Sequence, residues 1–364
     1  MDNFHFNNNF LIELAKKNGT PLYVYNGNLI VQRYKELFQF IPWSKLKIFY
    51  AMKANYNPAI LKLLEKNNAC VDAVSPGDVL LALKCGFSKE RIIFTANKIT
   101  DEEMHFVKSL GVLFNIDSLS RLEKYGKAYP NSDICIRFNS NVVAGEHERV
   151  RTGGESTKFG ILINKSKEVT VIAKKYNLKI IGLHEHTGSG IPETVKVLEG
   201  MKNLLAIIDT ETFPDLRFVD FGGGFKVPYH PQEKRIDYAK FGTEIVETFN
   251  TFCKRYGKEL EMYFEPGKYI VAEAGYLIIE VNTLKENNHK LIAGTNSGFS
   301  QLLRPILYNA YHHIINLSNP QGSLKKYDIC GNICESGDCF AVDREINEIR
   351  EGDILAILNA GAYA

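Results

Sequence analysis

Short apolar runs recur along the first three quarters of the chain, and polar segments with helical spacing separate them. Most of the runs are rich in Ile, Val, Phe and Tyr, residues that favour strands. Eight runs lie at 46–54, 69–75, 91–97, 112–117, 133–139, 179–187, 217–221 and 261–265. The segments between them include 58–67, 77–85, 166–176 and 238–256, which we predict to be helices. Eight strands that alternate with helices predict an α/β fold, a parallel (β/α)8 TIM barrel.

The pattern changes after residue 275, where strand-like runs are separated by turns with little helix between them. These runs lie at 276–285, 289–293, 326–331 and 352–358, and a further one at 21–25 precedes the barrel. We therefore predict two domains. A barrel spans 28–272, and residues 1–27 and 273–364 form a domain of β-sandwich or barrel-like type. A long polar insertion at 141–160, after the fifth strand, is a candidate active-site loop.

Composition narrows the classes of protein to consider. The 364 residues suit a large barrel with a smaller second domain, and a net charge of +2 gives no reason to expect nucleic acid or an anionic membrane as partner. No signal peptide is visible, and no apolar stretch reaches the length of a membrane span. The seven cysteines include no Cys-x-x-Cys pair, so we expect a reduced, cytoplasmic protein.

Chemically unusual residues fall repeatedly at the carboxyl ends of the predicted barrel strands, where barrel enzymes place their active sites. They are Lys53 after the first strand, Asp72 and Ser75 after the second, Arg137 after the fifth, His184 and His186 after the sixth, Gly222, Gly223 and Gly224 after the seventh, and Glu265 after the eighth. Their shared position predicts one site at this end of the barrel.

Lys53 ends an apolar run, where a lone ammonium group must be paired, deprotonated or covalently engaged. A lysine with a lowered pKa in an apolar slot suits Schiff-base chemistry with an aldehyde cofactor. An ordinary ion pair or a side chain that reaches solvent is the more common explanation of such a lysine. Taken alone, the residue leaves both interpretations open.

The glycines and Glu265 also allow more than one interpretation. Gly222, Gly223 and Gly224 would let backbone N–H groups approach a phosphate, and Ser189 could add a hydroxyl, although a plain tight turn needs the same glycines. Glu265 could keep a pyridine nitrogen protonated, or it could form an ion pair with Arg137 or Lys268.

His184 and His186 lie on the same face of a strand. They could ligate a metal, but we find no convincing third ligand, so we expect no metal. One ring could instead stack on an aromatic cofactor, and the other could be a hydrogen-bonded core residue.

Two segments of the β region carry polar side chains of interest. Cys334 and Glu335, in a run that ends at Asp338, bring a thiol and carboxylates together, although a solvated turn is the plainer interpretation. Arg304 could hold a carboxylate with two hydrogen bonds, or it could be a surface arginine.

Taken together, these segments resemble the fold-type III pyridoxal-phosphate decarboxylases, and within them the meso-diaminopimelate decarboxylases. The matching motifs, in the family's order, are Tyr50-Ala51-Met52-Lys53-Ala54-Asn55, His184-Glu185-His186-Thr187-Gly188-Ser189-Gly190, Asp220-Phe221-Gly222-Gly223-Gly224-Phe225, Glu265-Pro266-Gly267-Lys268, Arg304-Pro305-Ile306-Leu307-Tyr308, Cys334-Glu335-Ser336-Gly337-Asp338 and Gly361-Ala362-Tyr363. They cover nearly the whole chain. The resemblance implies a barrel joined to a C-terminal β-domain of the alanine racemase and ornithine decarboxylase type.

The resemblance also implies a cofactor, pyridoxal 5'-phosphate, and a role for each matching residue. Lys53 would bond to the cofactor aldehyde and Cys334 would return a proton to the substrate carbon. The cofactor-binding residues would be Lys53, Asp72, Arg137, His186, Ser189, Gly222, Gly223, Gly224, Glu265 and Tyr363. The substrate-binding residues would be Lys268, Arg304, Tyr308, Glu335 and Tyr363.

In the family, the segment that carries Cys334 and Glu335 comes from the partner subunit, so a homodimer with shared active sites is implied. The implied reaction converts meso-diaminopimelate to L-lysine and carbon dioxide, the last step of lysine biosynthesis. Decarboxylation of ornithine, arginine or carboxynorspermidine, and a non-catalytic relative that binds the cofactor, remain alternatives. Because the family normally continues beyond Gly-Ala-Tyr through further strands, we expect the β-domain to be truncated at Ala364.

Overall fold

The computed structural model describes residues 6–150, 152–154, 157–192 and 194–364. The chain divides into two compact units. One consists of residues 33–226 and 236–267, and the other of residues 1–32, 227–235 and 268–364. The domain limits at residues 28 and 272 stay a prediction. None of the described helices is both long and apolar enough to cross a membrane.

The first unit is a closed barrel of eight parallel strands, which confirms the predicted fold. The strands are β2 (Leu46–Ala51), β3 (Cys70–Ala73), β4 (Ile92–Phe94), β5 (Leu113–Ile116), β6 (Asp133–Asn139), β8 (Lys179–His184), β9 (Phe218–Asp220) and β10 (Glu261–Phe264). Parallel pairing of β5 with β6 and of β10 with β2 closes the ring. The short β7 (Ile161–Leu162) pairs with β6 outside it.

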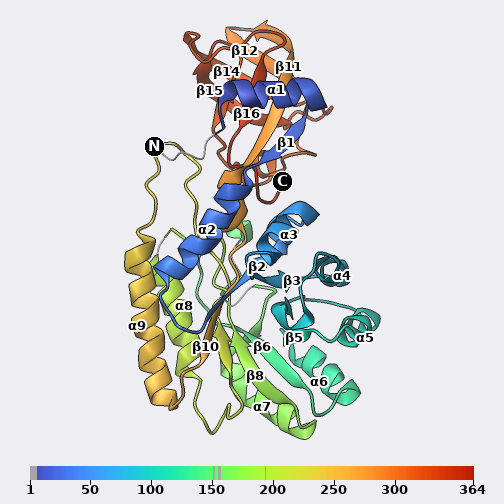
Figure 1. Cartoon of the computed structure of the whole chain (residues 1–364), viewed down its shortest axis with the longest axis vertical. Coiled ribbons are helices and arrows are strands. Elements are labelled where there is room, and N and C mark those ends of the chain that lie inside the picture. The colour runs from blue at the N-terminus through green and yellow to red at the C-terminus, as the bar shows by residue number, and fades with distance from the viewer. Residues whose placement is uncertain (1–5, 151, 155–156, 193) are drawn as a thin grey trace. The chain divides into compact units, whose positions relative to one another are not determined.

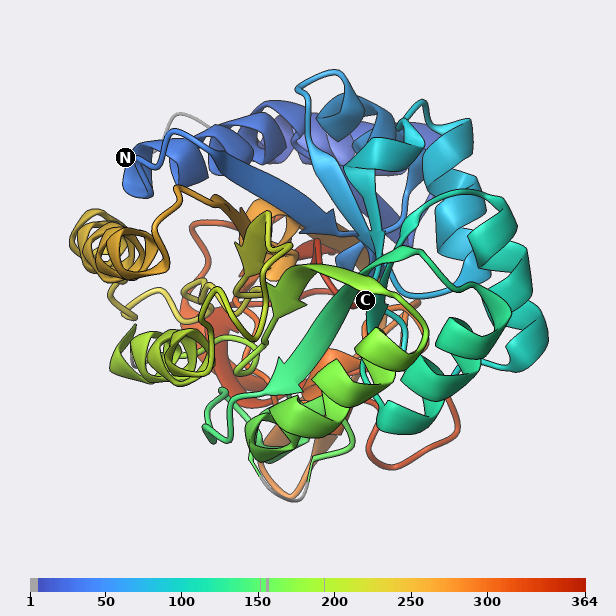
Figure 2. The same cartoon turned by 90° about the horizontal axis from the view of Figure 1, so that it is seen from below.

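Helices surround the strands, as Figure 2 shows. They are α3 (Pro58–Glu65), α4 (Pro76–Lys84), α5 (Asp101–Ser109), α6 (Leu119–Ala128), α7 (Ser166–Lys175), α8 (Thr194–Ala206) and α9 (Tyr238–Tyr256), with α2 (Gly27–Phe40) before the first strand. Hydroxyl side chains begin several of them, because an oxygen at the N-cap accepts from an otherwise unpaired backbone N–H. Ser75 caps α4 and Ser118 caps α6 in this way.

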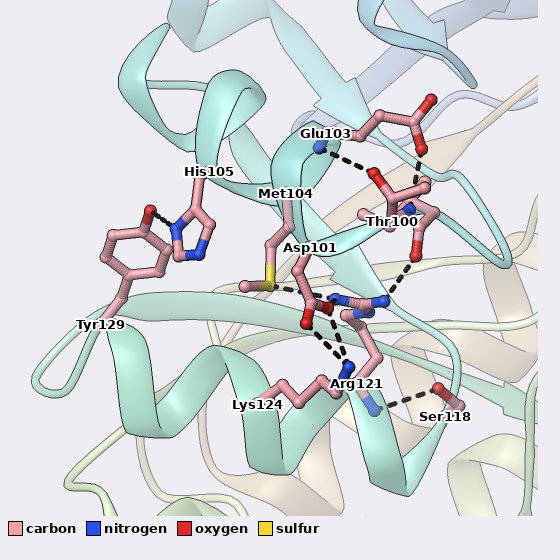
Figure 3. Close-up of polar contacts among 10 residues, drawn as sticks. Thr100, Asp101, Glu103, Met104, His105, Ser118, Arg121, Lys124 and Tyr129 are labelled. Atoms are coloured by element: carbon pink, nitrogen blue, oxygen red, sulfur yellow. Dashed lines mark hydrogen bonds and ion pairs between the residues drawn. The ribbon is translucent and has the colours of Figure 1, made fainter.

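A polar cluster joins the start of α5 to α6 (Figure 3). Arg121 donates to Asp101 at 2.6 Å and to the carbonyl of Ile99, while Lys124 donates to Asp101 at 2.8 Å. Thr100 and Glu103 form a capping box at the start of α5. The charged side chains of this region therefore hold α5 and α6 against each other.

The observed first barrel strand is shorter than the predicted run, which changes the setting of Lys53. β2 ends at Ala51, the last residue that pairs with β3. The chain then forms a 3-10 turn, Met52–Ala54, closed by a hydrogen bond from Asn55 N to Met52 O of 3.0 Å. Lys53 therefore lies in a turn at the strand's end and not within the strand.

The second unit contains a sheet with the order β13-β16-β11-β12-β14-β15, and β1 pairs with β11. Its strands are β1 (Leu22–Tyr25), β11 (Gly275–Asn287), β12 (Lys290–Thr295), β13 (Ile314–Asn316), β14 (Leu324–Cys330), β15 (Cys339–Asn347) and β16 (Ile354–Ile357), and several are labelled in Figure 1. The helices α1 (Asn8–Asn18), α10 (Lys268–Val271) and α11 (Arg304–Tyr308) belong to it. The sequence pattern missed β13 and β15, because edge strands do not need a continuous apolar run.

Candidate active site

Lys53 and Asp72 form an ion pair at the carboxyl ends of neighbouring barrel strands. Lys53 Nζ lies 2.5 Å from Asp72 Oδ2, and Asp72 is fully buried. Burial and the nearby Glu265 raise the pKa of Asp72 to about 6, although Lys53 opposes the rise. Within the described part of the chain, Asp72 Oδ1 has no hydrogen-bond partner. The amine of Lys53 is thus held directly against a buried carboxyl group.

Glu265 is buried and bonded to two side chains from other strands. Its Oε2 lies 3.2 Å from His184 Nε2, and its Oε1 accepts from Thr95 Oγ1 at 3.3 Å. Burial alone would raise the pKa of Glu265, but His184 and Lys53 outweigh it and hold the pKa at about 2. Glu265 is therefore charged at neutral pH. The alternative of an ion pair with Arg137 or Lys268 stays a prediction, and the charge of Glu265 does act on Arg137.

Arg137, in β6, is a second buried charge of the barrel. Its guanidinium carbon lies 4.9 Å from the centre of the Phe159 ring. Burial lowers the pKa of Arg137 below its usual value, while Glu265 and Asp117 act in the opposite direction. An arginine stays protonated even so, and Arg137 adds a positive charge to the carboxylates at this end of the barrel.

The three glycines after β9 form a backbone cradle that no side chain could occupy. Gly222 and Gly224 have φ angles of +63° and +100°, and a Cβ on Gly223 would lie 2.5 Å from the carbonyl oxygen of Glu265. The amide of Gly222 donates to Asp220 Oδ1, and that of Gly223 donates to His186 Nδ1. Two of the three amides are thus used within the chain, and the Gly224 amide and the Ser189 hydroxyl are candidate donors to an anion.

His186 is fixed by backbone contacts on both sides. Its Nδ1 accepts from the Gly223 amide at 3.2 Å, and its carbonyl oxygen accepts from Thr152 Oγ1 at 2.7 Å. Desolvation, with Arg137 nearby, holds the pKa of His186 well below its usual value. The ring is therefore neutral and has a fixed orientation, as a ring that stacks on a flat cofactor requires.

The second unit brings two buried cations to one aromatic ring. The guanidinium carbon of Arg304 lies 4.2 Å from the centre of the Tyr229 ring, and Lys268 Nζ lies 5.9 Å from it. Arg304 also donates to His312 Nε2 at 3.1 Å, and His312 Nδ1 donates to the Leu358 carbonyl. Burial lowers the pKa of His312 to about 3, so the ring is neutral and can accept from Arg304. The alternative of a surface arginine is wrong.

The loop that carries Cys334 and Glu335 is exposed but ordered by Asp338. That carboxylate accepts from the amide of Phe299 at 2.7 Å and from the amide of Ile333 at 2.9 Å. A Cβ on Gly337 would lie 3.1 Å from Ile306, so the loop packs beside α11, which also holds Tyr308. Tyr363 is 37% exposed and has a φ of +57°. Arg304 is buried, whereas Cys334 and Glu335 are exposed.

Sequence reasoning missed Thr95 and Asn115. Asn115 Nδ2 donates to Thr95 Oγ1 at 3.4 Å, and both residues are buried. Each is a polar residue within an apolar run, so each could have been found by extending the search for strand-end residues to the third and fourth strands. Among the described residues, the one group that could hold a metal is His184 with Asp220 and Glu265, which contains one of the two histidines considered from the sequence.

Comparisons with known proteins agree with this geometry. The family described as "Pyridoxal-dependent decarboxylase, pyridoxal binding domain" matches residues 28–272. Diaminopimelate decarboxylase of Methanothermobacter thermautotrophicus is 41% identical over 97% of this chain and 84% of its own length. The Aquifex aeolicus enzyme of the same name is 36% identical with the same coverage.

Solved structures of decarboxylases are also similar to this chain. Diaminopimelate decarboxylase of Helicobacter pylori, complexed with L-lysine, superposes with a TM-score of 0.89 at 31% identity, covering 97% of this chain and 89% of that one. The lysine/ornithine decarboxylase of Vibrio vulnificus, at 22% identity and a TM-score of 0.86, shares the fold. The chain therefore belongs to the pyridoxal-dependent decarboxylases, in the family of the diaminopimelate decarboxylases.

Proposed function

We propose that this chain decarboxylates meso-diaminopimelate to L-lysine and carbon dioxide, with pyridoxal 5'-phosphate as its cofactor. The relatives named diaminopimelate decarboxylase support this function over nearly the full length of the chain. The observation that carries it is the arrangement around Lys53 and Glu265. A paired lysine amine and a charged, buried carboxylate lie at the carboxyl ends of one barrel's strands.

The residues of the barrel fit this cofactor. When bound, pyridoxal phosphate supplies an aldehyde that bonds to amines and a ring that accepts the electrons released when a carboxylate departs. Lys53 would bond to the aldehyde, and the charged Glu265 would pair with a protonated ring nitrogen. The Ser189 hydroxyl, the glycine cradle and Tyr363 would hold the phosphate. His186 would stack on the ring, and Arg137 would contribute positive charge.

Asp72 and Lys53 would manage the proton that the reaction requires. An ammonium group must lose a proton before its nitrogen can act as a nucleophile. Asp72 Oδ2 is within hydrogen-bond distance of Lys53 Nζ, and its pKa of about 6 lets it accept and return that proton near neutral pH. Asp72 would thus act as the proton partner of Lys53.

The second unit would recognise the distal end of the substrate. Arg304 and Lys268 suit a carboxylate, because both are buried cations beside one ring. Glu335 suits the distal amine, and Tyr308 and Tyr363 would line the same end. A site that offers both charges favours a zwitterionic group over the simple amine of ornithine.

We also propose that two copies of the chain form the active enzyme. Cys334 and Glu335 lie on an exposed, ordered loop, which suits residues that act in a partner's barrel. The Cys334 thiol would donate the proton that replaces the departing carboxylate. All seven cysteines are free thiols, in keeping with a reduced cytoplasmic location.

Two measurements test the proposal. The purified protein should show the visible absorbance of a cofactor bonded to lysine, and Lys53→Ala should abolish it and lower the decarboxylation rate by at least about a thousandfold. Lys62→Ala, at an exposed lysine of α3, is the matched control and should change neither. Retained absorbance in Lys53→Ala would remove Lys53 from its role.

Substrate identity is tested separately, by carbon dioxide release from meso-diaminopimelate, ornithine, arginine and carboxynorspermidine. We expect release from the first and little from the others. Activity only on another member of the panel would refute the proposed substrate. A bound cofactor without any release would point to a non-catalytic relative.

A further inference from the structure

Three buried carboxyl groups lie close together in the barrel, and only one of them is stabilised as an anion. Burial raises the pKa of Asp72 to about 6, and burial next to Glu265 raises the pKa of Asp220 well above its usual value. The pKa of Glu265 is instead held at about 2. The position of the negative charge therefore depends on the groups that contact each carboxyl group, and above all on those that contact Glu265.

One such contact is a directed chain of hydrogen bonds from β5 through Thr95. Asn115 Nδ2 donates to Thr95 Oγ1 at 3.4 Å, so the single hydroxyl hydrogen of Thr95 is left to point elsewhere. Glu265 Oε1 accepts that hydrogen at 3.3 Å, and Asp72 is the other carboxyl group with which Thr95 interacts. A carboxylate is an acceptor only, so this chain favours the charged form of Glu265.

The other contact is His184, in β8. Burial, with Arg137 and Lys53 nearby, lowers the pKa of His184, although Glu265 opposes the effect, so the ring is neutral and carries one N–H. Since Nε2 lies 3.2 Å from Glu265 Oε2, the hydrogen belongs on Nε2. The Nδ1 atom, which then has only a lone pair, makes no hydrogen bond in the described structure, as this tautomer requires.

We propose that His184 is a positioning residue that fixes the charge and the orientation of Glu265 and, through Glu265, sets how tightly the cofactor's ring nitrogen is bound. The inference rests on the proposed role of Glu265. Its consequence is specific. Losing the His184 donor should weaken the interaction with the ring nitrogen and leave the rest of the cofactor's contacts unchanged.

The test compares two ligands of the cofactor-free protein, pyridoxal phosphate and its 1-deaza analogue, in which carbon replaces the ring nitrogen. Dissociation constants are measured by spectroscopic titration. His184→Leu should weaken the binding of pyridoxal phosphate about tenfold to a hundredfold, which is the usual range for a hydrogen bond to a charged group. It should change binding of the analogue less than about threefold. His184→Gln, whose amide can donate from nearly the place of Nε2, should recover most of the loss.

Two further variants make the result interpretable. Glu265→Gln should also weaken the binding of pyridoxal phosphate and spare that of the analogue. Adding His184→Leu to it should weaken binding little further, because both residues act through the carboxylate of Glu265. His105→Phe is the control. This exposed histidine of α5 bonds to the Tyr129 hydroxyl (Figure 3) and is outside the set of residues proposed to hold the cofactor, so its loss should leave both constants unchanged.

Equal weakening of both ligands by His184→Leu would overturn the inference and assign His184 a purely structural role. If Glu265→Gln weakens only the binding of pyridoxal phosphate and His184→Leu weakens the binding of both ligands, the inference fails while the role of Glu265 stands. If Glu265→Gln is not selective either, that proposed role fails as well. Should His184→Leu not fold, His184→Asn, whose amide replaces Nδ1 and not Nε2, gives the same comparison with His184→Gln.

Discussion

At the scale of single residues, neighbours a few ångströms away decide the charge state of each buried group. Asp72 and Glu265 are both buried carboxyl groups at strand ends, yet the pKa of one is raised and that of the other is lowered. The positions of both were predictable, because each follows an apolar run. Their partners were not, because His184 and Thr95 lie on other strands and meet Glu265 only when the barrel closes.

Glu185 carries a pH-dependent cost in stability that the sequence did not indicate. It is fully buried, accepts from Ser140 and Thr187, and burial raises its pKa to about 7. Between the unfolded pKa near 4.5 and the folded value, the native state binds more protons than the unfolded state, so stability falls as pH rises. Glu185→Gln should therefore raise the unfolding free energy by up to about 3 kcal/mol near pH 8 and change it little near pH 5.

Thermal unfolding of the cofactor-free protein, followed across this pH range, checks the prediction. Glu199→Gln removes an exposed carboxylate of α8 and serves as the control, with no pH-dependent gain expected. An equal effect of Glu185→Gln at both pH values would show that lost hydrogen bonds, and not the charge, dominate at this site.

At the scale of elements, the barrel strands were predictable and the irregular pieces were not. The apolar runs indicated all eight strands in order, because parallel strands of a barrel are buried on both faces. The turn that carries Lys53 and the edge strands β13 and β15 escaped detection, since local pairing and not hydrophobicity defines them. The sequence also did not show which face of a helix packs closely against a neighbour, as the glycines of α4 and α9 illustrate.

Gly242, within α9, lies where the helix meets the end of α2. A Cβ there would lie 1.7 Å from the carbonyl oxygen of Phe40, so Gly242→Ala forces the two elements apart. We expect a loss of about 1–3 kcal/mol in unfolding free energy, even though alanine favours helices by about 1 kcal/mol over glycine. Chemical denaturation of the purified variants measures the difference.

Gly77→Ala in α4 is the matched comparison. Its Cβ would meet nothing closer than Ser75 Oγ at 3.7 Å, so this change should be neutral or stabilising by up to about 1 kcal/mol. If both alanine variants proved equally stable, close packing of α9 on the end of α2 would not be the reason for the glycine.

At the scale of the whole molecule, the proposed enzyme needs residues from two sets of chain segments. The barrel unit contains Lys53 and Glu265, and the other unit contains Cys334 and Glu335. The order of the motifs along the chain predicted which residues take part in the reaction. Whether Cys334 serves the barrel of its own chain or that of a partner depends on assembly, which a pattern along one chain does not encode.

Mixing two inactive variants tests the shared site directly. Lys53→Ala lacks the amine that bonds to the cofactor, and Cys334→Ala lacks the proposed proton donor. If each site combines Lys53 of one subunit with Cys334 of its partner, a mixed dimer has one intact site and one doubly altered site. Random re-association of equal amounts through a two-fold interface should then restore about a quarter of the wild-type activity.

The same experiment distinguishes the alternative in which each chain supplies both residues. Every site in the mixture would then lack one group, and activity would stay at the level of the separate variants. The double variant Lys53→Ala/Cys334→Ala mixed with wild-type protein is the control. Under the shared arrangement its mixed dimers have no intact site, because each site receives one altered residue, so activity should fall to about a quarter of the value for wild-type protein alone at equal total chain concentration. Without sharing it should fall only to about half, since every wild-type chain would keep its own site.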